Sequence, residues 1–446
     1  MRLSVVGLGK LGICTAICFA SKGHKVIGVD SDRKLVGELK EHRCRIREKG
    51  LSELMAKSWE NFEATTDIED AVLRSDITLI VVPTPSQPDG RFSNEHIEDV
   101  LRKIGPTLGI KDDFHIVNVV STVMPGSAEA SFKPLLERLS GRTCGANFGL
   151  VYNPEFIALG SVIRDFLNPD LVLIGASDER SAEPVERLYL STCDSHPYVA
   201  KMSLLNAEIT KLSLNCFVTM KISFANELAS ICEKIHSADI DMVTNAIGKD
   251  SRIGSKYLKG GLGFGGPCFP RDNLAFQAFA KDVCAEARLG PQVVAINKSV
   301  VERLFDVISS NIPKGGNAAL LGLAYKDGTH VIEESQSIAL ARKLRFAGYT
   351  VNVTDTAAME EAKQELGDEF GYFTDPYECV TDAQAVVVLT RSPQFERLDW
   401  HRIDKIVGDG AILLDSWRML RNQPFTRLNY TALGLGKTHL CESKKK

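Results

Sequence analysis

One of the eleven cysteines in this 446-residue chain lies in a segment that sets it apart. Residues 263–272 read GFGGPCFPRD, with Cys268 near the centre. Glycines let the backbone approach a bulky polar ligand, and the flanking prolines hold the cysteine in one presentation. Arg271 is near enough in sequence to favour the thiolate, and Asp272 could accept or donate a proton. The pattern predicts a nucleophilic cysteine; the alternative is a structural thiol buried in a Gly/Pro loop.

A lysine and an asparagine upstream of this segment could stabilise negative charge. Glu208, Lys211 and Asn215 are three and four residues apart, so they share one face of a predicted helix. Lys211 and Asn215 can both donate to a substrate oxygen on which charge develops. A solvated helix face with an ordinary ion pair has the same spacing, and spacing alone favours this second interpretation.

A glutamate follows a predicted strand in the sequence NPEF, residues 153–156. The apolar neighbours Phe156 and Ile157 would partly desolvate Glu155. A desolvated carboxyl group has a raised pKa, which suits general acid–base work. The alternative is a carboxylate that caps the end of the strand.

A glycine-rich motif near the N-terminus predicts a dinucleotide site. It follows a predicted strand, opens a predicted helix and reads Gly7-Leu8-Gly9-Lys10-Leu11-Gly12. Such glycines allow the tight turn and the approach of backbone to a pyrophosphate, and the helix N-terminus supplies free N–H groups. Asp30 ends the second strand, where it can accept hydrogen bonds from ribose hydroxyls and would repel a 2′-phosphate. The motif therefore predicts NAD rather than NADP.

Two further segments follow predicted strands at the edge where doubly wound sheets bind ligands. They read VPTP at 82–85 and STVMPG at 121–126. We expect Val82, Thr84, Ser121 and Thr122 to contact the cofactor. The alternative for the two threonines is simple loop capping.

Short apolar runs alternate with helical patterns in two blocks, which predicts an α/β protein. The fold expected is two Rossmann-like doubly wound parallel-sheet domains joined by a long central helix, near residues 203–234, and a helical dimerisation region. The expected divisions are residues 1–200, 201–300, 315–435 and a flexible tail, 436–446. Strands are expected at 3–6, 25–29, 77–82, 116–120, 150–152 and 171–174, then at 318–323, 350–353, 385–389 and 412–414, with a helix at 335–347.

Composition excludes several classes of function. Lys and Arg number 53 against 57 Asp and Glu, a net charge of -4, which argues against a nucleic-acid partner. No run of about 20 apolar residues predicts a membrane span, and no leader pattern is visible, so we expect a cytoplasmic protein. The cysteines are scattered without a Cys-x-x-Cys pair, which indicates reduced thiols and no metal site.

The order of these motifs resembles the UDP-glucose/GDP-mannose dehydrogenase family over essentially the whole chain. The resemblance also rests on Glu208-x-x-Lys211-x-x-x-Asn215, on RIGSKYLK at 252–259 and on LGLAYK at 321–326. The resemblance implies an NAD-binding Rossmann domain, a helical linker that forms a homodimer or larger assembly, and a C-terminal domain for a nucleotide sugar. It also implies polysaccharide biosynthesis and a four-electron oxidation of the sugar C6 alcohol to an acid with two NAD.

The resemblance also implies roles for single residues. Cys268 would add to the C6 aldehyde, giving a thiohemiacetal that becomes a thioester, while Lys211 and Asn215 stabilise the oxyanion. Asp272 and Thr122 would handle the proton and water, and Glu155 would assist hydrolysis. Arg252 would reach the nucleotide sugar of a neighbouring subunit. The implied substrate-binding residues are Phe156, Ile157, Lys211, Asn215, Arg252, Tyr257, Leu258, Lys259, Phe264, Gly265, Phe269, Lys326 and Arg418.

Three positions depart from the family pattern. Leu159 stands where glucose-type members usually carry a glutamate, Glu333 where many have an arginine near the cofactor, and Asp415-Ser416-Trp417-Arg418 replaces an Asp-Gly-Arg pattern. The sugar, the base and the cofactor affinity are therefore open. Two alternatives remain at this point: a two-electron β-hydroxyacid dehydrogenase, which needs neither Cys268 nor a second α/β domain, and a non-catalytic regulator that binds NAD or a nucleotide sugar.

Overall fold

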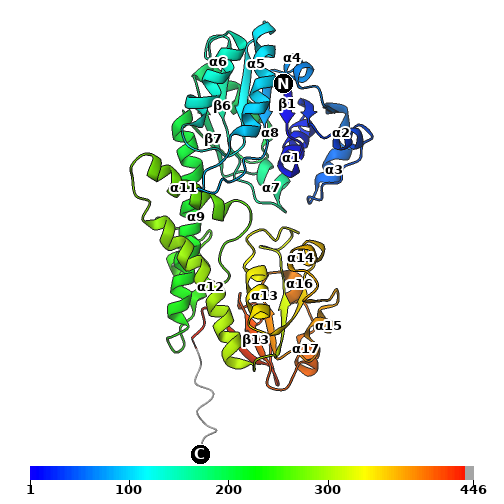
Figure 1. Cartoon of the computed structure of the whole chain (residues 1–446), viewed down its shortest axis with the longest axis vertical. Coiled ribbons are helices and arrows are strands. Elements are labelled where there is room, and N and C mark those ends of the chain that lie inside the picture. Colours follow the sequence, from blue (N-terminus) through cyan, green and yellow to red (C-terminus); the bar gives the residue numbers. More distant parts are fainter. Residues whose placement is uncertain (437–446) are drawn as a thin grey trace, which may run out of the picture. The chain divides into compact units, whose positions relative to one another are not determined.

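The computed structural model describes residues 1–436 (Figure 1). The chain divides into two compact units, Met1–Ser213 and the part from Leu214 onward. Apart from Gly436, the tail predicted at 436–446 lies outside the described residues, as does Cys441.

The first unit is built on an eight-stranded sheet of order β3-β2-β1-β4-β5-β6-β7-β8. The first six positions of this order, from β3 to β6, have the strand order of a dinucleotide-binding fold. All neighbouring strands are parallel except β6 and β7, which pair antiparallel. The strands are β1 Arg2–Val6, β2 Lys25–Val29, β3 Phe62–Thr65, β4 Ile77–Ile80, β5 His115–Val119, β6 Phe148–Tyr152, β7 Leu171–Ala176 and β8 Tyr198–Ser203.

Helices cover both faces of this sheet, as a doubly wound fold requires. One buried cluster joins the sheet to α1, α2, α3, α7 and α8, and a second joins it to α4, α5 and α6. The helical segments are α1 Lys10–Ser21, α2 Arg33–Lys40, α3 Leu51–Ala56, η1 Trp59–Asn61, α4 Ile68–Arg74, α5 Glu95–Ile110, η2 Ala128–Phe132, α6 Lys133–Ser140, α7 Val162–Leu167 and α8 Glu179–Thr192.

The predicted long helix is α9, Leu204–Cys232, and its 29 residues span roughly 44 Å. Its sequence contains neither Gly nor Pro, so no residue interrupts the backbone hydrogen bonds. The boundary between the two units falls inside α9, after Ser213. Within residues 1–436, no helix combines the length and the apolar character needed to cross a lipid bilayer.

The second unit contains a six-stranded parallel sheet of order β11-β10-β9-β12-β13-β14. This order repeats that of the first six strands of the first unit. The strands are β9 Asn317–Leu321, β10 Thr350–Thr354, β11 Gly371–Tyr372, β12 Ala385–Val388, β13 Ile412–Asp415 and β14 Asn429–Ala432. The predicted fold class is therefore confirmed.

Helices again bury both faces of the second sheet. One cluster includes apolar residues of α12, α13 and α14, and the other includes residues of α15, α16 and α17. The helices that follow α9 are α10 Ile240–Ile247, α11 Phe269–Asp282, α12 Leu289–Asn311, α13 Gln336–Phe346, α14 Met359–Leu366, α15 Pro376–Val380, α16 Pro393–Glu396 and α17 Trp400–Ile406.

Candidate active site

The glycine motif between β1 and α1 has the geometry of a dinucleotide cradle. Gly7 has φ +94°, and a Cβ there would lie 2.5 Å from the carbonyl oxygen of Val81. A Cβ on Gly12 would lie 1.8 Å from the carbonyl oxygen of Gly7, so only glycine allows this turn. A Cβ on Gly9, by contrast, would have no neighbour within 4 Å, and no side chain caps α1. The open helix N-terminus fits a pyrophosphate.

Asp30 closes the cradle at the end of β2. One carboxylate oxygen accepts the backbone N–H of Leu8 at 2.7 Å and the other accepts that of Asp32 at 2.9 Å. Each oxygen keeps a lone pair for a ribose hydroxyl. The Leu8 side chain is fully buried, so this residue faces the cradle through its backbone, whereas Lys10 is exposed and Leu11 is half-buried.

The two loops after β4 and β5 are fastened to each other. The Thr84 hydroxyl donates to the carbonyl oxygen of Thr122 at 2.7 Å, and the Ser121 hydroxyl donates to that of Val82 at 2.6 Å. Since β1, β4 and β5 are neighbours in the sheet, these loops and the glycine turn meet at the carboxyl ends of the strands. Thr84 and Ser121 thus hold the loops together.

Glu208 is not part of a solvated helix face. Its side chain is buried, and its carboxylate accepts the backbone N–H groups of Gly126 at 2.6 Å and Ala128 at 2.8 Å. Burial raises the pKa of Glu208 to about 7, while the two N–H groups oppose that rise. The interpretation that spacing favoured is therefore wrong: Glu208 anchors the loop that carries Ser121 and Thr122.

Lys211 lies one turn further along α9 and is also buried. Its ammonium group donates to the backbone carbonyl of Glu155 at 2.6 Å. It also lies 4.5 Å from the ring centroid of Phe156. The structure thus joins the NPEF segment to α9, and the lysine charge is fixed at the end of β6.

Glu155 has a buried partner that the sequence did not reveal. The Tyr189 hydroxyl, on α8, donates to its Oε1 at 2.7 Å. Burial raises the pKa of Glu155 to about 7, opposed by that hydrogen bond and by the charge of Lys211. The predicted desolvation is present, and no local motif pointed to Tyr189, because 34 residues separate the two.

The segment after Phe156 is held by apolar packing and by one carboxylate. Ile157 and Leu159 pack against the first core cluster. Glu48 accepts the backbone N–H groups of Gly160 and Val162, both at 3.0 Å. Glu48 was also missed, since nothing in its local sequence marks it.

In the second unit, Cys268 is exposed and immediately precedes α11. The positive end of this helix favours an anionic sulfur. Asp272, in the first turn of α11, is buried and accepts the side-chain amide of Asn215 at 2.6 Å. The backbone N–H of Asp272 donates to the carbonyl oxygen of Cys268 at 2.9 Å. The structure therefore brings together Cys268, Asp272 and Asn215.

The glycines before Cys268 pack closely against the loop after β9, within the second unit. A Cβ on Gly265 would lie 2.4 Å from the carbonyl oxygen of Glu334, and one on Gly266 would lie 2.7 Å from the Tyr325 ring. The N–H of Gly266 donates to the carbonyl oxygen of Glu333 at 2.9 Å. Glu333, which differs from the family pattern in its side chain, thus holds the cysteine loop through its backbone.

Three aromatic residues predicted to bind substrate lie together in this region. The Phe269 ring makes edge-on contacts with Tyr257 and Phe264, with centroids 6.3 Å apart in both pairs. Tyr257 is exposed, and its φ of 63° lies in the left-handed region. Phe264 and the neighbouring Leu258 are buried, so of the three rings that of Tyr257 is the most accessible.

Two further cationic residues of the predicted substrate set are Arg252 and Lys326. Arg252 is exposed and forms an ion pair with Asp250 at 2.7 Å. Lys326 lies 5.9 Å from the ring centroid of Tyr325. The Arg252 side chain is therefore accessible to solvent.

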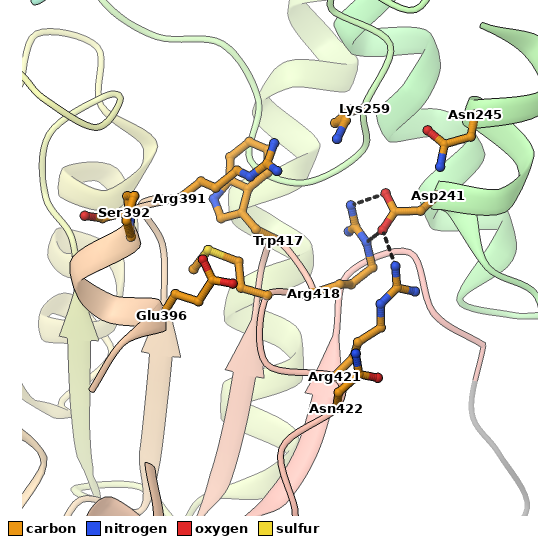
Figure 2. Close-up of a pocket in the computed structure, with 12 residues that line it drawn as sticks. Asp241, Asn245, Lys259, Arg391, Ser392, Glu396, Trp417, Arg418, Arg421 and Asn422 are labelled. Atoms are coloured by element: carbon orange, nitrogen blue, oxygen red, sulfur yellow. Dashed lines mark hydrogen bonds and ion pairs between the residues drawn. The ribbon is translucent and has the colours of Figure 1, made fainter. Parts of the chain in front are cut away.

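The second unit holds a polar pocket of about 430 Å³ (Figure 2). Its walls come from α10, the loop before Cys268, the loop after β12 together with α16, and the loop after β13. The lining residues are Asp241, Asn245, Lys259, Arg391, Ser392, Pro393, Glu396, Trp417, Arg418, Met419, Arg421 and Asn422. Four cations against two carboxylates suit an anionic ligand.

Arg418 holds together the segments that form the wall of this pocket. Its guanidinium forms two hydrogen bonds with Asp241, at 2.9 and 3.0 Å (Figure 2). It also donates to the carbonyl oxygens of Gly260 and Leu433. Burial alone would raise the pKa of Asp241, but Arg418 and Arg421 hold it below its usual range. Trp417 lines the pocket with its indole N–H bonded to the carbonyl of Leu389 at 2.6 Å.

Family models match all three parts of the chain. The NAD binding domain of the UDP-glucose/GDP-mannose dehydrogenase family matches residues 1–192, the central domain matches 205–299, and the UDP binding domain matches 319–422. The chain belongs to the UDP-glucose/GDP-mannose dehydrogenase family. It is an NAD-dependent enzyme of the nucleotide-sugar 6-dehydrogenase type.

Known members of the family are similar over most of their length. The UDP-glucose 6-dehydrogenase of Haloferax volcanii is 36% identical over 403 residues, 90% of this chain and 93% of that protein. The GDP-mannose 6-dehydrogenase of Azotobacter vinelandii is 31% identical over 416 residues, 89% of this chain and 93% of that protein. The structure of a UDP-glucose dehydrogenase from Pyrobaculum islandicum has a TM-score of 0.86 at 33% identity and covers 97% of both chains.

The glycine cradle and the pocket lie in different domains of the family. The glycine cradle lies in the match to the NAD binding domain, and most of the pocket residues lie in the match to the UDP binding domain. NAD is thus the cofactor, and the substrate is a nucleotide sugar.

Proposed function

We propose that this enzyme oxidises the C6 alcohol of a UDP-hexose, in the first place UDP-glucose, to the carboxylic acid in two steps. The exposed thiol of Cys268 at the start of α11, one turn from the buried Asn215–Asp272 pair, is the observation that carries the proposal. A covalent thioester allows a second oxidation before the product leaves. The β-hydroxyacid alternative needs no second α/β domain, and this chain has one.

NAD, when bound, accepts one hydride in each oxidation. The residues that would hold it are the glycine cradle, Asp30 and the loops of Thr84 and Thr122. Lys211 and Asn215 would stabilise negative charge on the C6 oxygen. The Cys268 sulfur would add to the C6 aldehyde to give a thiohemiacetal, which loses the second hydride and becomes a thioester. Asp272 and Thr122 would receive and relay the protons.

Hydrolysis of the thioester would restore the thiol. A water molecule gives a proton to Glu155, its oxygen adds to the thioester carbonyl, and the carbon–sulfur bond breaks. The sulfur leaves as a thiolate and the sugar leaves as an acid. A carboxyl group with a pKa of about 7 can accept this proton near neutral pH.

The nucleotide would bind in the pocket that Lys259 and Trp417 line. Lys259 and Arg391 supply positive charge for a diphosphate, and an indole face can stack on a base. Relatives include enzymes that act on UDP-glucose and on GDP-mannose, so family membership leaves the base open. The apolar Leu159, where glucose-type members usually have a glutamate, also leaves the sugar to experiment.

We also propose that the enzyme is a homodimer through α9. Phe217, Phe224 and Ile231 are seven residues apart, lie on one face of this helix and are 59%, 46% and 49% exposed. A stripe of this kind on a soluble enzyme indicates a protein contact. A second copy of the chain would cover it, with Arg252 reaching toward the partner subunit's substrate.

The proposed reaction is tested by its stoichiometry. With UDP-glucose we expect two NADH per sugar consumed and the acid as product. Cys268→Ala should lose acid formation while it binds NAD with unchanged affinity, and Cys284→Ala, at the other exposed cysteine of the described residues, should behave as the parent enzyme. One NADH per sugar, or acid formation by Cys268→Ala, would contradict the thioester route. Parallel assays with GDP- and dTDP-sugars identify the preferred base.

A further inference from the structure

Tyr189 is a buried polar residue that the proposed chemistry has not used. Its ring is packed edge-on against Phe19 with centroids 5.7 Å apart and lies 5.8 Å from Phe166. It is 2% exposed, so the ring is fixed by the core between α1, α7 and α8. Its hydroxyl donates to Oε1 of Glu155 at 2.7 Å. A rigid donor therefore meets the carboxylate from inside the fold.

The hydrogen bond restricts how the carboxylate can turn. Glu155 follows β6 in a segment without regular secondary structure, so its side chain is not oriented by a helix or strand. The Lys211 ammonium holds the Glu155 backbone through its carbonyl oxygen, at 2.6 Å. Tyr189 holds the other end of the same residue. With Oε1 fixed, Oε2 keeps one orientation.

The groups around Glu155 determine its charge. Cys18 of α1 and Cys193 after α8 interact with it electrostatically, as do Tyr189 of α8 and Lys211 of α9. Burial raises the pKa of Glu155, and the Tyr189 hydrogen bond with the lysine charge limits that rise. Burial also raises the pKa of Tyr189 well above its ordinary value, so the hydroxyl keeps its proton and remains a donor.

We infer that Tyr189 is a positioning residue that orients the Glu155 carboxylate for proton transfer from the hydrolytic water. The inference rests on the proposed role of Glu155. In the step concerned, water loses a proton to Oε2, the water oxygen bonds to the thioester carbon, and the carbon–sulfur bond breaks. Tyr189 exchanges no proton; it holds Oε1 and favours the ionised carboxylate that the step requires.

The test is Tyr189→Phe, which keeps the packed ring and removes only the hydroxyl. We expect kcat to fall about tenfold, as for the loss of one hydrogen bond to a charged group, with the KM values for NAD and the nucleotide sugar unchanged. The acid limb of the kcat profile should move to higher pH, because a carboxyl group without this donor ionises less readily. The acyl-enzyme should accumulate and be visible by intact-mass measurement.

A matched control is Tyr198→Phe, the same change at a residue that is 73% exposed in the same unit. It should leave kcat, the pH profile and the melting temperature unchanged. If Tyr189→Phe lowers the melting temperature but leaves kcat and its pH profile unchanged, Tyr189 is only structural and the inference is wrong.

A double-variant cycle separates this inference from the proposed function. Glu155→Gln should lose hydrolysis, and adding Tyr189→Phe to it should cause no further loss. If Glu155→Gln hydrolyses the thioester normally, the proposed role of Glu155 fails. If Glu155→Gln loses hydrolysis and adding Tyr189→Phe lowers the residual rate of hydrolysis further, Tyr189 does not act through Glu155 and only the inference fails.

Discussion

Exposure distinguishes the cysteines from one another. Among the ten in residues 1–436, Cys14, Cys18, Cys232 and Cys379 are buried, while Cys268 and Cys284 are exposed. Burial raises the pKa of the Cys379 thiol to about 12, so it stays protonated and unreactive. Cys268 adds to its exposure a position at a helix N-terminus beside the Asn215–Asp272 pair. Local environment therefore supports one cysteine as the nucleophile.

The Asn215–Asp272 contact makes a prediction with a defined pH dependence. Both side chains are buried, and Asn215→Asp would set a second carboxyl group against Asp272 at the present 2.6 Å contact. Two carboxylates this close cannot both ionise, so the pair has a raised pKa in the folded state. The folded variant is then stable at low pH, and its free energy of unfolding falls as pH rises through the raised pKa of the pair. We expect a loss of roughly 3 kcal/mol at pH 8 and a smaller one at pH 5.

Thermal unfolding of the variant between pH 5 and pH 8 measures this effect. Asn206→Asp provides the control, because Asn206 is exposed on the same helix. The control should follow the parent protein at every pH. A variant at Asn215 whose melting temperature differs from the parent by the same amount at pH 5 and pH 8 would show that the two groups do not interact.

At the scale of elements, the turn from β1 to α1 makes separable predictions for stability and cofactor binding. Gly12→Ala puts a Cβ 1.8 Å from the Gly7 carbonyl oxygen, which should cost about 2–3 kcal/mol of stability and abolish NAD binding. Gly9→Ala meets no atom within 4 Å, so the fold should be unaffected. Its methyl group would stand at the open helix N-terminus, so NAD affinity should fall at least about tenfold.

Melting curves and NAD titration test both variants against Gly37→Ala. Gly37 lies on α2 and also has no neighbour within 4 Å, but it is remote from the glycine turn in sequence. This control should keep both stability and NAD affinity. Unchanged NAD binding in Gly9→Ala would rule out the pyrophosphate position proposed for the helix N-terminus.

The strands that the sequence did not predict share a position. The four strands that were missed are β3, β8, β11 and β14, and these are the four edges of the two sheets. A central strand of a parallel sheet is buried on both faces and reads as a continuous apolar run, as in β12, AVVV. An edge strand is partly solvated and needs no such run; β8 reads YVAKMS with Lys201 inside it. Hydrophobic pattern therefore predicts the centre of a sheet better than its border.

At the scale of the whole molecule, the exposed stripe on α9 predicts the oligomeric state. The double variant Phe217→Glu/Phe224→Glu should replace the apolar contact by like charges and convert a dimer to monomers. Light scattering at micromolar concentration measures the change as a halved molar mass. Phe346→Glu, at a residue that is 96% exposed on α13, should keep the parent's mass. A monomeric parent protein, or a double variant that remains dimeric, would refute the proposed interface.

The division into three domains at 1–200, 201–300 and 315–435 stays a prediction. The structure divides the chain into two compact units with the boundary inside α9, because this continuous helix contributes residues to both. Glu208 and Lys211 belong to the first unit, and Asn215, one turn later, belongs to the second. The long helix therefore contributes buried polar residues to both units.

The sequence by itself determined the fold class and the NAD motif and led to the prediction of Cys268 as the nucleophile, because each depends on residues that are close together in the chain. Glycine spacing, apolar runs and a Gly/Pro-framed cysteine are local patterns. Only the tertiary structure decided that Glu155 meets Tyr189, 34 residues away, that Asn215 meets Asp272, 57 residues away, and that Glu208 meets Gly126, 82 residues away. A buried polar group must be hydrogen-bonded, but its partner is selected by how the sheet and helices pack, and no local spacing records that choice.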